Sequence, residues 1–82
     1  MKIDSKKEKE QKLLEFLFNK YGAMVDVEVA SSILKKSRAT LYRDRKNGTG
    51  VNFIQDKDNG TIRYPIHEIA SYIYETGKKN EA

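Results

Sequence analysis

One short segment, from Lys35 to Gly48, contains the signals for both ends of a helix and the whole of the chain's excess positive charge. Ser37 is a suitable N-cap because its hydroxyl can accept a backbone hydrogen bond, and Gly48 is a common C-terminal stop. Residues 35–46 hold six cations and one anion, Asp44, which gives +5 against +4 for the whole chain. A compact basic helix in an otherwise near-neutral chain is typical of proteins that bind nucleic acid.

The length of 82 residues is that of one domain with a modest hydrophobic core, so residues 1–82 are treated as a single unit. The chain has no cysteine, which excludes disulfide bonds and zinc–thiolate sites such as zinc fingers. No apolar run approaches the ~18 residues of a membrane span, and the first residues lack the apolar stretch of a signal peptide. These features predict a cytoplasmic protein that does not contact a membrane.

Residues 5–21 are expected to form an additional N-terminal helix. Ser5 and Glu8 have capping-box spacing, and Gly22 is a suitable stop. Phe16 lies on the flank of the apolar stripe, where it would be either a core residue or the anchor of a homodimer or protein-partner contact. The stripe itself is expected to contain Leu13, Leu14, Leu17, Phe18 and Tyr21.

The basic helix is preceded by a second helix, predicted to begin after Asp26 and to end at Leu34. The β-branched residues of 24–29 would also suit a strand, but Glu28 near a helix N-terminus favours the helix. Residues 26–47 therefore read as a helix-turn-helix. In this motif the second helix enters the DNA major groove.

A β-hairpin, or wing, is predicted over residues 51–64, with strands at 51–55 and 61–64 and Asn59-Gly60 as a two-residue turn.

Pro65 ends the hairpin, and a last helix follows over residues 66–76, stopping near Gly77. Its apolar side is expected to contain Ile66, Ile69, Ala70 and Ile73. The predicted fold class is mostly α with a small β-hairpin: a winged helix-turn-helix with an extra N-terminal helix. Phe53 and Tyr64 of the wing are expected in its core.

The run from Ala30 to Arg43 resembles the core of the MerR-like helix-turn-helix of excisionases and AlpA-type phage regulators. Gly48-Thr49-Gly50-Val51-Asn52-Phe53-Ile54 is similar to the start of that family's wing, and Arg63-Tyr64-Pro65 to its end. The resemblance covers about residues 26–75 and implies a small DNA-binding protein of a phage or mobile element. It also implies that the DNA-reading positions are Ser37, Arg38, Thr40, Tyr42 and Arg43, with a wing contact at Arg63.

The chain departs from the family pattern at four positions: Lys35, Lys36, Asp44 and Val51, where a proline is frequent. Lys35 occupies the position of the usual turn glycine, and Lys36 that of an apolar residue. Asp44 lies close to the DNA-facing side, where it would restrain Arg43 or Arg45, or repel DNA.

The expected DNA contacts divide by chemistry. Arg38 and Arg43 can read guanine edges through bidentate hydrogen bonds, while Tyr42 and Ala39 can contact thymine methyl groups. Lysines are expected to bind phosphates and fix the register on the duplex. The complete set is Lys35, Lys36, Ser37, Arg38, Ala39, Thr40, Tyr42, Arg43, Lys46, Lys57 and Arg63.

No catalytic or cofactor-binding pattern is found in the sequence. The single histidine, His67, has only Glu68 beside it, which provides neither a metal site nor a catalytic triad. The sequence predicts no enzyme, cofactor or metal. It predicts a sequence-specific double-stranded DNA-binding protein, such as a small transcription regulator. The alternatives are an excisionase-like recombination directionality factor and, in another class, a DNA-recognition adaptor in a phage packaging or other assembly.

Overall fold

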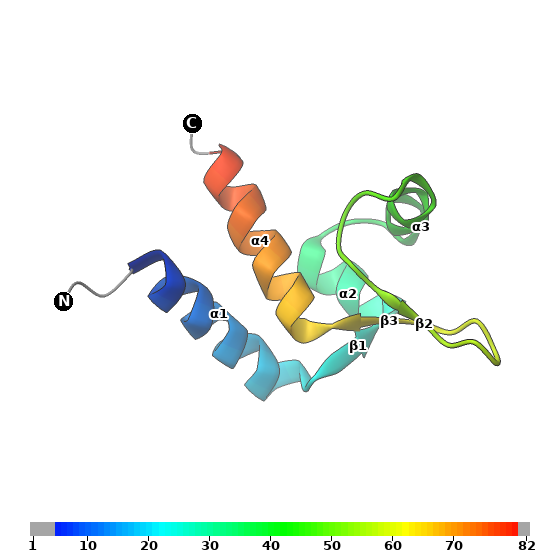
Figure 1. Ribbon diagram of the computed structural model, residues 1–82, viewed down its shortest axis with the longest axis horizontal. Coiled ribbons are helices and arrows are strands. Elements are labelled where there is room, and N and C mark those ends of the chain that lie inside the picture. The colour runs from blue at the N-terminus through cyan, green and yellow to red at the C-terminus, as the bar shows by residue number, and fades with distance from the viewer. Residues whose placement is uncertain (1–4, 81–82) are drawn as a thin grey trace.

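The computed structural model describes the backbone of residues 5–80 and the side chains of residues 8–75. Within this part of the chain, four helices surround a small three-stranded antiparallel sheet (Figure 1). None of these helices combines the length and apolar character that crossing a membrane requires. In chain order the elements are α1 (Ser5–Tyr21), β1 (Met24–Asp26), α2 (Val27–Leu34), α3 (Arg38–Asn47), β2 (Ile54–Gln55), β3 (Ile62–Pro65) and α4 (Ile66–Asn80).

Local capping signals set the end of α1 and the start of α2, as the sequence predicts. The N–H of Gly22 donates to the carbonyl of Phe18 at 2.8 Å and closes α1. The Asp26 carboxylate accepts from the N–H of Val29 at 2.9 Å and starts α2. The predicted capping box of α1 requires the Ser5 side chain, which lies outside the described residues.

The sheet contains one strand that was not predicted from the sequence. Residues Met24–Asp26 form β1, which pairs with β3 so that Val25 lies opposite Tyr64. The strand order is β1-β3-β2. The rejection of a strand at residues 24–29 is therefore wrong for its first half. The pairing partner lies far along the chain, so local helix propensity could not reveal it.

The hairpin differs from its predicted form in two ways. Its first strand is only Ile54–Gln55, because Val51 is buried in the core instead of pairing. Its turn is longer than the expected two residues. The N–H of Gly60 donates to the carbonyl of Asp56, and the N–H of Asp56 to the carbonyl of Thr61, both at 2.9 Å.

Side chains stabilise this longer turn. The Asp56 carboxylate accepts from the N–H of Asp58 at 2.8 Å, and the Asn59 side chain from the N–H of Thr61 at 2.9 Å. Short polar side chains commonly hold turns in this way.

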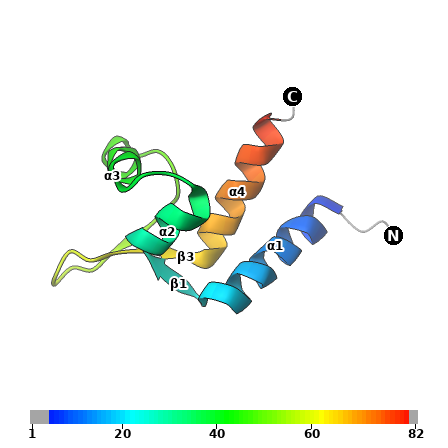
Figure 2. The same ribbon diagram turned by 180° about the vertical axis from the view of Figure 1, so that it is seen from behind.

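The last helix is longer than predicted, since α4 continues through Gly77 to Asn80. A glycine inside a helix costs only about 1 kcal/mol relative to alanine, which does not force an end. Figures 1 and 2 show α1 and α4 running antiparallel beside each other, with α3 on the other side of the molecule.

The core is built from nearly every element. Two aromatic residues depart from expectation: Phe18 is 52% exposed and Phe53 37% exposed, so neither is a core residue. Phe16 is 59% exposed, which leaves the second of its two predicted roles, a partner contact, untested. Phe18 follows the buried Leu17 and is rotated from it by about 100° around the helix axis, which moves it off the stripe. The buried residues are Leu17, Val25, Ala30, Leu41, Val51, Tyr64, Ile66, Ile69 and Ala70.

Candidate nucleic-acid interface

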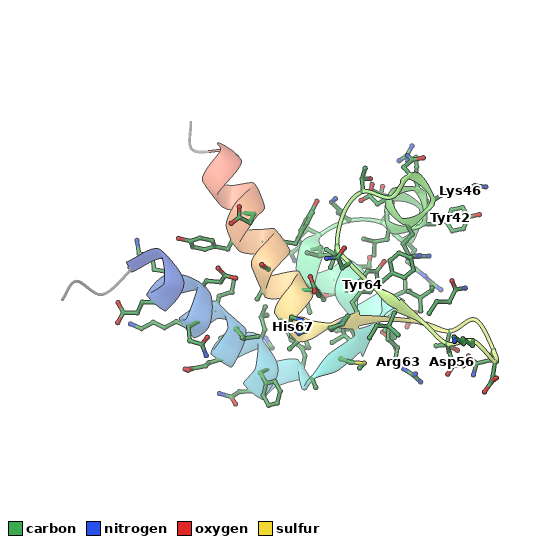
Figure 3. The ribbon with its side chains drawn as sticks, viewed as in Figure 1. Tyr42, Lys46, Asp56, Arg63, Tyr64 and His67 are labelled. Carbon is green, nitrogen blue, oxygen red and sulfur yellow. The ribbon has the colours of Figure 1, made fainter. Side chains whose placement is uncertain are left out.

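Helix α3 separates its apolar and its basic sides. Leu41 is only 2% exposed and anchors the helix to the core. Figure 3 shows Tyr42 and Lys46 pointing away from the rest of the molecule. Five of the expected DNA contacts on this helix are exposed: Arg38, Ala39, Tyr42, Arg43 and Lys46.

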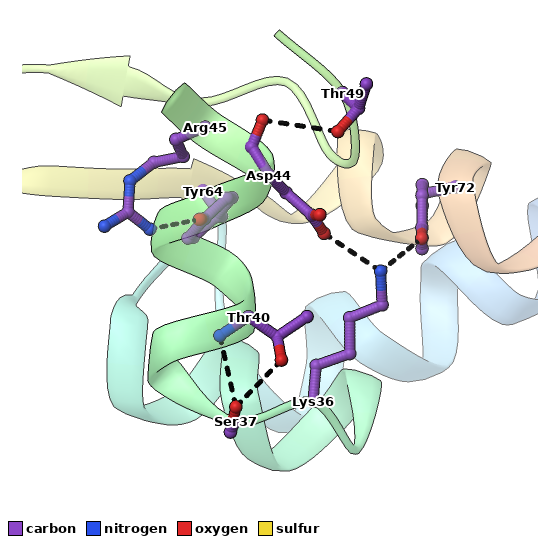
Figure 4. A network of polar contacts seen from close by, with 8 residues as sticks. All are labelled: Lys36, Ser37, Thr40, Asp44, Arg45, Thr49, Tyr64 and Tyr72. Carbon is purple, nitrogen blue, oxygen red and sulfur yellow. Dashed lines mark hydrogen bonds and ion pairs between the residues drawn. The ribbon is translucent and has the colours of Figure 1, made fainter. Parts of the chain in front are cut away.

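The start of α3 is fixed by two hydroxyl groups (Figure 4). Ser37 Oγ accepts from the N–H of Thr40 at 3.1 Å, and the two hydroxyl oxygens lie 2.9 Å apart. The polar groups of Ser37 and Thr40 are therefore engaged in capping. Arg38 Nη1 lies 3.5 Å from the Glu28 carboxylate, but both side chains are exposed, so this contact is weak.

The turn between α2 and α3 is made without glycine. Lys35 adopts the left-handed conformation, with φ 57° and ψ 39°, and its N–H donates to the carbonyl of Ser31. This conformation is unfavourable by roughly 1 kcal/mol or more for a residue with a Cβ atom. The Lys35 side chain is exposed at the end of α2 and beside the start of α3.

The neighbouring lysine has a different environment. Lys36 Nζ donates to the Tyr72 hydroxyl at 2.6 Å and to Asp44 Oδ2 at 3.1 Å, and it lies 4.9 Å from the centre of the Tyr72 ring (Figure 4). Only 29% of the Lys36 side chain and 23% of that of Asp44 are exposed. The ammonium group is thus bound within the protein, between α3 and α4, which disfavours its expected role as a phosphate contact.

This contact also changes the expected role of Asp44, whose ion pair is with Lys36 and not with Arg43 or Arg45. The hydrogen bond to Tyr72, together with the contact to Asp44, raises the pKa of Lys36 above its ordinary value, although desolvation acts against the shift. The ammonium therefore stays charged at neutral pH, and the carboxylate beside it is neutralised locally.

Asp44 also fixes the segment that follows α3. Its backbone carbonyl accepts from the N–H of Thr49 at 2.9 Å. Gly50 has φ +80°, and a Cβ atom placed there would lie 2.9 Å from the Cβ of Asp44. Gly48-Thr49-Gly50 would suggest a flexible joint from its composition, but specific contacts hold this link against α3.

Arg45, which was not among the DNA contacts predicted from the sequence, joins α3 to the hairpin. Arg45 Nη1 donates to the Tyr64 hydroxyl at 2.7 Å. Its guanidinium lies 5.8 Å from the Tyr42 ring centre and 5.9 Å from that of Phe53, within cation–π range. Arg45 and Tyr42 are neighbours by helical spacing, but the contacts with Phe53 and Tyr64 depend on tertiary structure.

These side chains line an open groove of about 480 Å³ between α3 and the hairpin. Lys46 contributes a further cation, 5.8 Å from the centre of the Tyr42 ring. The groove therefore combines positive charge with flat aromatic surface. Its lining residues are Tyr42, Arg45, Lys46, Phe53, Gln55, Gly60 and Ile62.

The two predicted wing contacts occupy different places. Lys57 is exposed in the turn of the hairpin. Arg63 is exposed in β3, opposite Ile54 in β2 and Asp26 in β1. Since successive side chains of a strand point to opposite faces, Arg63 lies on the sheet face away from Tyr64 and α3. Figure 3 shows it projecting below the sheet.

Comparison with protein-family models, curated proteins and solved structures finds no significant match to this chain. Among the residues that the structure describes, no three His, Cys, Asp or Glu side chains are grouped so that they could hold a metal ion. The support for a function therefore lies in the geometry of α3 and the hairpin.

Proposed function

We propose that this protein is a winged helix-turn-helix domain that binds double-stranded DNA in a sequence-specific manner. The observation that carries the proposal is the outward face of α3, which presents Arg38, Arg43 and Lys46 to solvent. The one acidic residue of this helix, Asp44, is neutralised by Lys36. A basic helix with no unpaired carboxylate suits the major groove.

The order of elements supports the same proposal. A short helix, a tight turn and a capped basic helix are followed directly by a two-stranded hairpin. In the proposed complex, Arg38 and Arg43 read base edges, and Tyr42 and Ala39 contact thymine methyl groups. Lys35, Lys46 and Lys57 bind phosphates, and the groove between α3 and the hairpin receives one sugar–phosphate strand.

We further propose that the domain acts as a small transcription regulator of a phage or mobile element, as its resemblance to AlpA-type regulators suggests. One such domain covers few base pairs, so useful affinity requires repeated sites, a dimer or a partner protein. Phe16, 59% exposed on α1, is an accessible anchor for that assembly.

In vitro selection from a random duplex library tests the proposal, because a sequence-specific protein enriches a defined motif. On the selected site, Arg38→Ala and Arg43→Ala should each lower affinity by about 1–3 kcal/mol at one base pair and relax the choice there. Lys46→Ala is the matched control, and it should weaken all sequences about equally. Failure to enrich any motif, or a uniform loss for both arginine variants, would contradict the assignment.

A further inference from the structure

A second surface has the opposite chemistry to α3. Three depressions lie along α4, two of them beside α1 and the third beside residues 50–52. The first two share Gln11, Leu14 and His67, and the first and third share Glu68 and Ser71, so each adjoins the next. We call the three depressions together the α1–α4 groove. Figure 3 shows His67 at the start of α4, beside α1.

The floor of the α1–α4 groove is apolar. Leu14 from α1 and Ile66 from α4 line it, and Ala23 lies at the end near the sheet. Phe18 lines the same end and is 52% exposed. A large aromatic side chain that is half exposed beside an apolar floor is a suitable anchor for a protein partner.

The rim of the groove is acidic. Glu10 and Glu15 line it from α1, and Glu68 and Glu75 from α4, whereas no lysine or arginine is among its lining residues. Glu68 is partly engaged, since it accepts from the Asn52 amide at 3.0 Å and lies 3.4 Å from His67. Among the described side chains, the other three carboxylates form no ion pair, so they are available to a basic partner.

We propose that the α1–α4 groove docks a cationic amphipathic helix of a partner protein. The apolar floor would receive side chains spaced at i, i+3, i+4 and i+7, and the carboxylates would pair with flanking lysines or arginines. The groove follows α4 from Ile66 to Glu75, roughly 14 Å at 1.5 Å per residue, which matches about three turns of a partner helix.

The negative charge of the α1–α4 groove favours a basic partner helix over DNA and over a second copy of the chain. Four carboxylates repel a nucleic acid, so DNA belongs to α3 and not to this groove. A second copy of the chain offers basic charge mainly on α3, which the proposed DNA contact uses. A separate basic helix leaves α3 free, so the protein could hold DNA and its partner at once.

The test uses the complete protein and a synthetic amphipathic peptide of about four helical turns, with leucines on one face and lysines on its flanks. A second peptide carries glutamates in place of the lysines. Binding is followed by fluorescence anisotropy, and the contact is mapped by amide chemical shifts. The lysine peptide should bind and shift the groove residues, more weakly as salt rises, and the glutamate peptide should not bind.

Two phenylalanines on the same helix provide a matched pair of variants. Phe18→Ser should weaken binding of the lysine peptide at least about tenfold, since an aromatic anchor contributes about 1–2 kcal/mol or more. Phe16→Ser removes an equally exposed ring outside the groove lining and should bind the peptide as the wild type does. Glu15→Lys should also weaken binding and flatten its salt dependence. Thermal melting verifies that each variant is folded.

Several results would overturn the proposal. The lysine peptide could fail to bind up to about 1 mM, or both peptides could bind equally well. The chemical-shift changes could be centred outside the groove, or Phe16→Ser and Phe18→Ser could weaken binding equally. Self-association of the free protein through Phe18 would also contradict it. The exclusion of a second copy rests on the proposed DNA binding, but the peptide measurements do not involve DNA, so the two proposals can fail separately. Phe18→Ser should leave the affinity for a single DNA site unchanged.

Discussion

The outward face of α3 and the α1–α4 groove lie on one small chain and carry opposite charge. Arg38, Arg43 and Lys46 are exposed on α3, while the groove is rimmed by carboxylates with no lysine or arginine among its lining residues. The net charge of +4 describes neither surface. The ion pair of Lys36 with Asp44 removes from the α3 face the one carboxylate that would oppose DNA. Charge separation, more than net charge, therefore defines what each surface can bind.

The largest expected effect of breaking this separation is from Asp44→Ala. It leaves the Lys36 ammonium partly buried without its counterion, and we expect a loss of about 1–2 kcal/mol of stability. For a domain of this size that corresponds to a melting temperature lower by roughly 5–10 °C. Thermal unfolding followed by circular dichroism measures it. If Asp44 instead faces DNA, the variant will keep its melting temperature and bind DNA more tightly.

The pH dependence of stability tests whether the Lys36 ammonium is bound within the protein. The folded-state pKa of Lys36 is raised by its hydrogen bond to Tyr72 and its contact with Asp44. Its contribution to stability is therefore complete below the ordinary lysine pKa and is lost as pH rises through the higher folded-state value. Denaturant titrations of wild type and Lys36→Met should differ at pH 7 and converge in strongly alkaline solution. A constant difference at every pH would show that the charge of Lys36 is irrelevant.

A smaller effect separates the two adjacent lysines. Lys35→Gly relieves the left-handed conformation and should stabilise the fold by about 0.5–1 kcal/mol. It should also lower the salt slope of DNA binding by about one, because one phosphate contact is lost. Lys36→Met should leave that slope unchanged. The opposite pattern in salt titrations would mean that Lys36, and not Lys35, reaches the phosphates.

The smallest effect on stability is expected for Phe16→Ala, since a ring that is 59% exposed contributes little to the core. The melting temperature of dilute protein should change by less than the equivalent of about 0.5 kcal/mol. If Phe16 anchors assembly, affinity at multi-site DNA should fall while single-site affinity stays the same. Melting several degrees lower, with unchanged cooperativity, would make Phe16 a structural residue only.

Local signals allowed much of this fold to be predicted from the sequence. Asp26 and Ser37 cap α2 and α3, and Gly48 ends α3 in a left-handed conformation, as their residue types indicate. The α3 residues expected to contact bases, Arg38, Ala39, Tyr42 and Arg43, are all exposed. These features depend on residues a few positions apart, so a single sequence contains the necessary information.

The remaining features depend on contacts between distant residues. Lys36 binds Tyr72, 36 positions away, and Arg45 binds Tyr64, 19 positions away. Neither partner can be chosen from charge or periodicity alone. For this reason the sequence assigned Lys36 to phosphate and omitted Arg45, whose cation–π contacts with Tyr42 and Phe53 lie in the groove beside the hairpin. Strand β1 was not predicted for the same reason, since it exists only through its pairing with β3.

The most direct test of the central claim is an amide chemical-shift titration of the whole protein with a duplex enriched by selection, at low and at moderate salt. We expect the largest shifts in α3 and at Lys57, with the amides of Glu15 and Phe18 unmoved. The affinity should fall with a log–log salt slope of about −3, as expected for three neutralised phosphates. Shifts concentrated in the α1–α4 groove, or binding that does not weaken as salt is raised, would contradict the assignment of DNA binding to the α3 face.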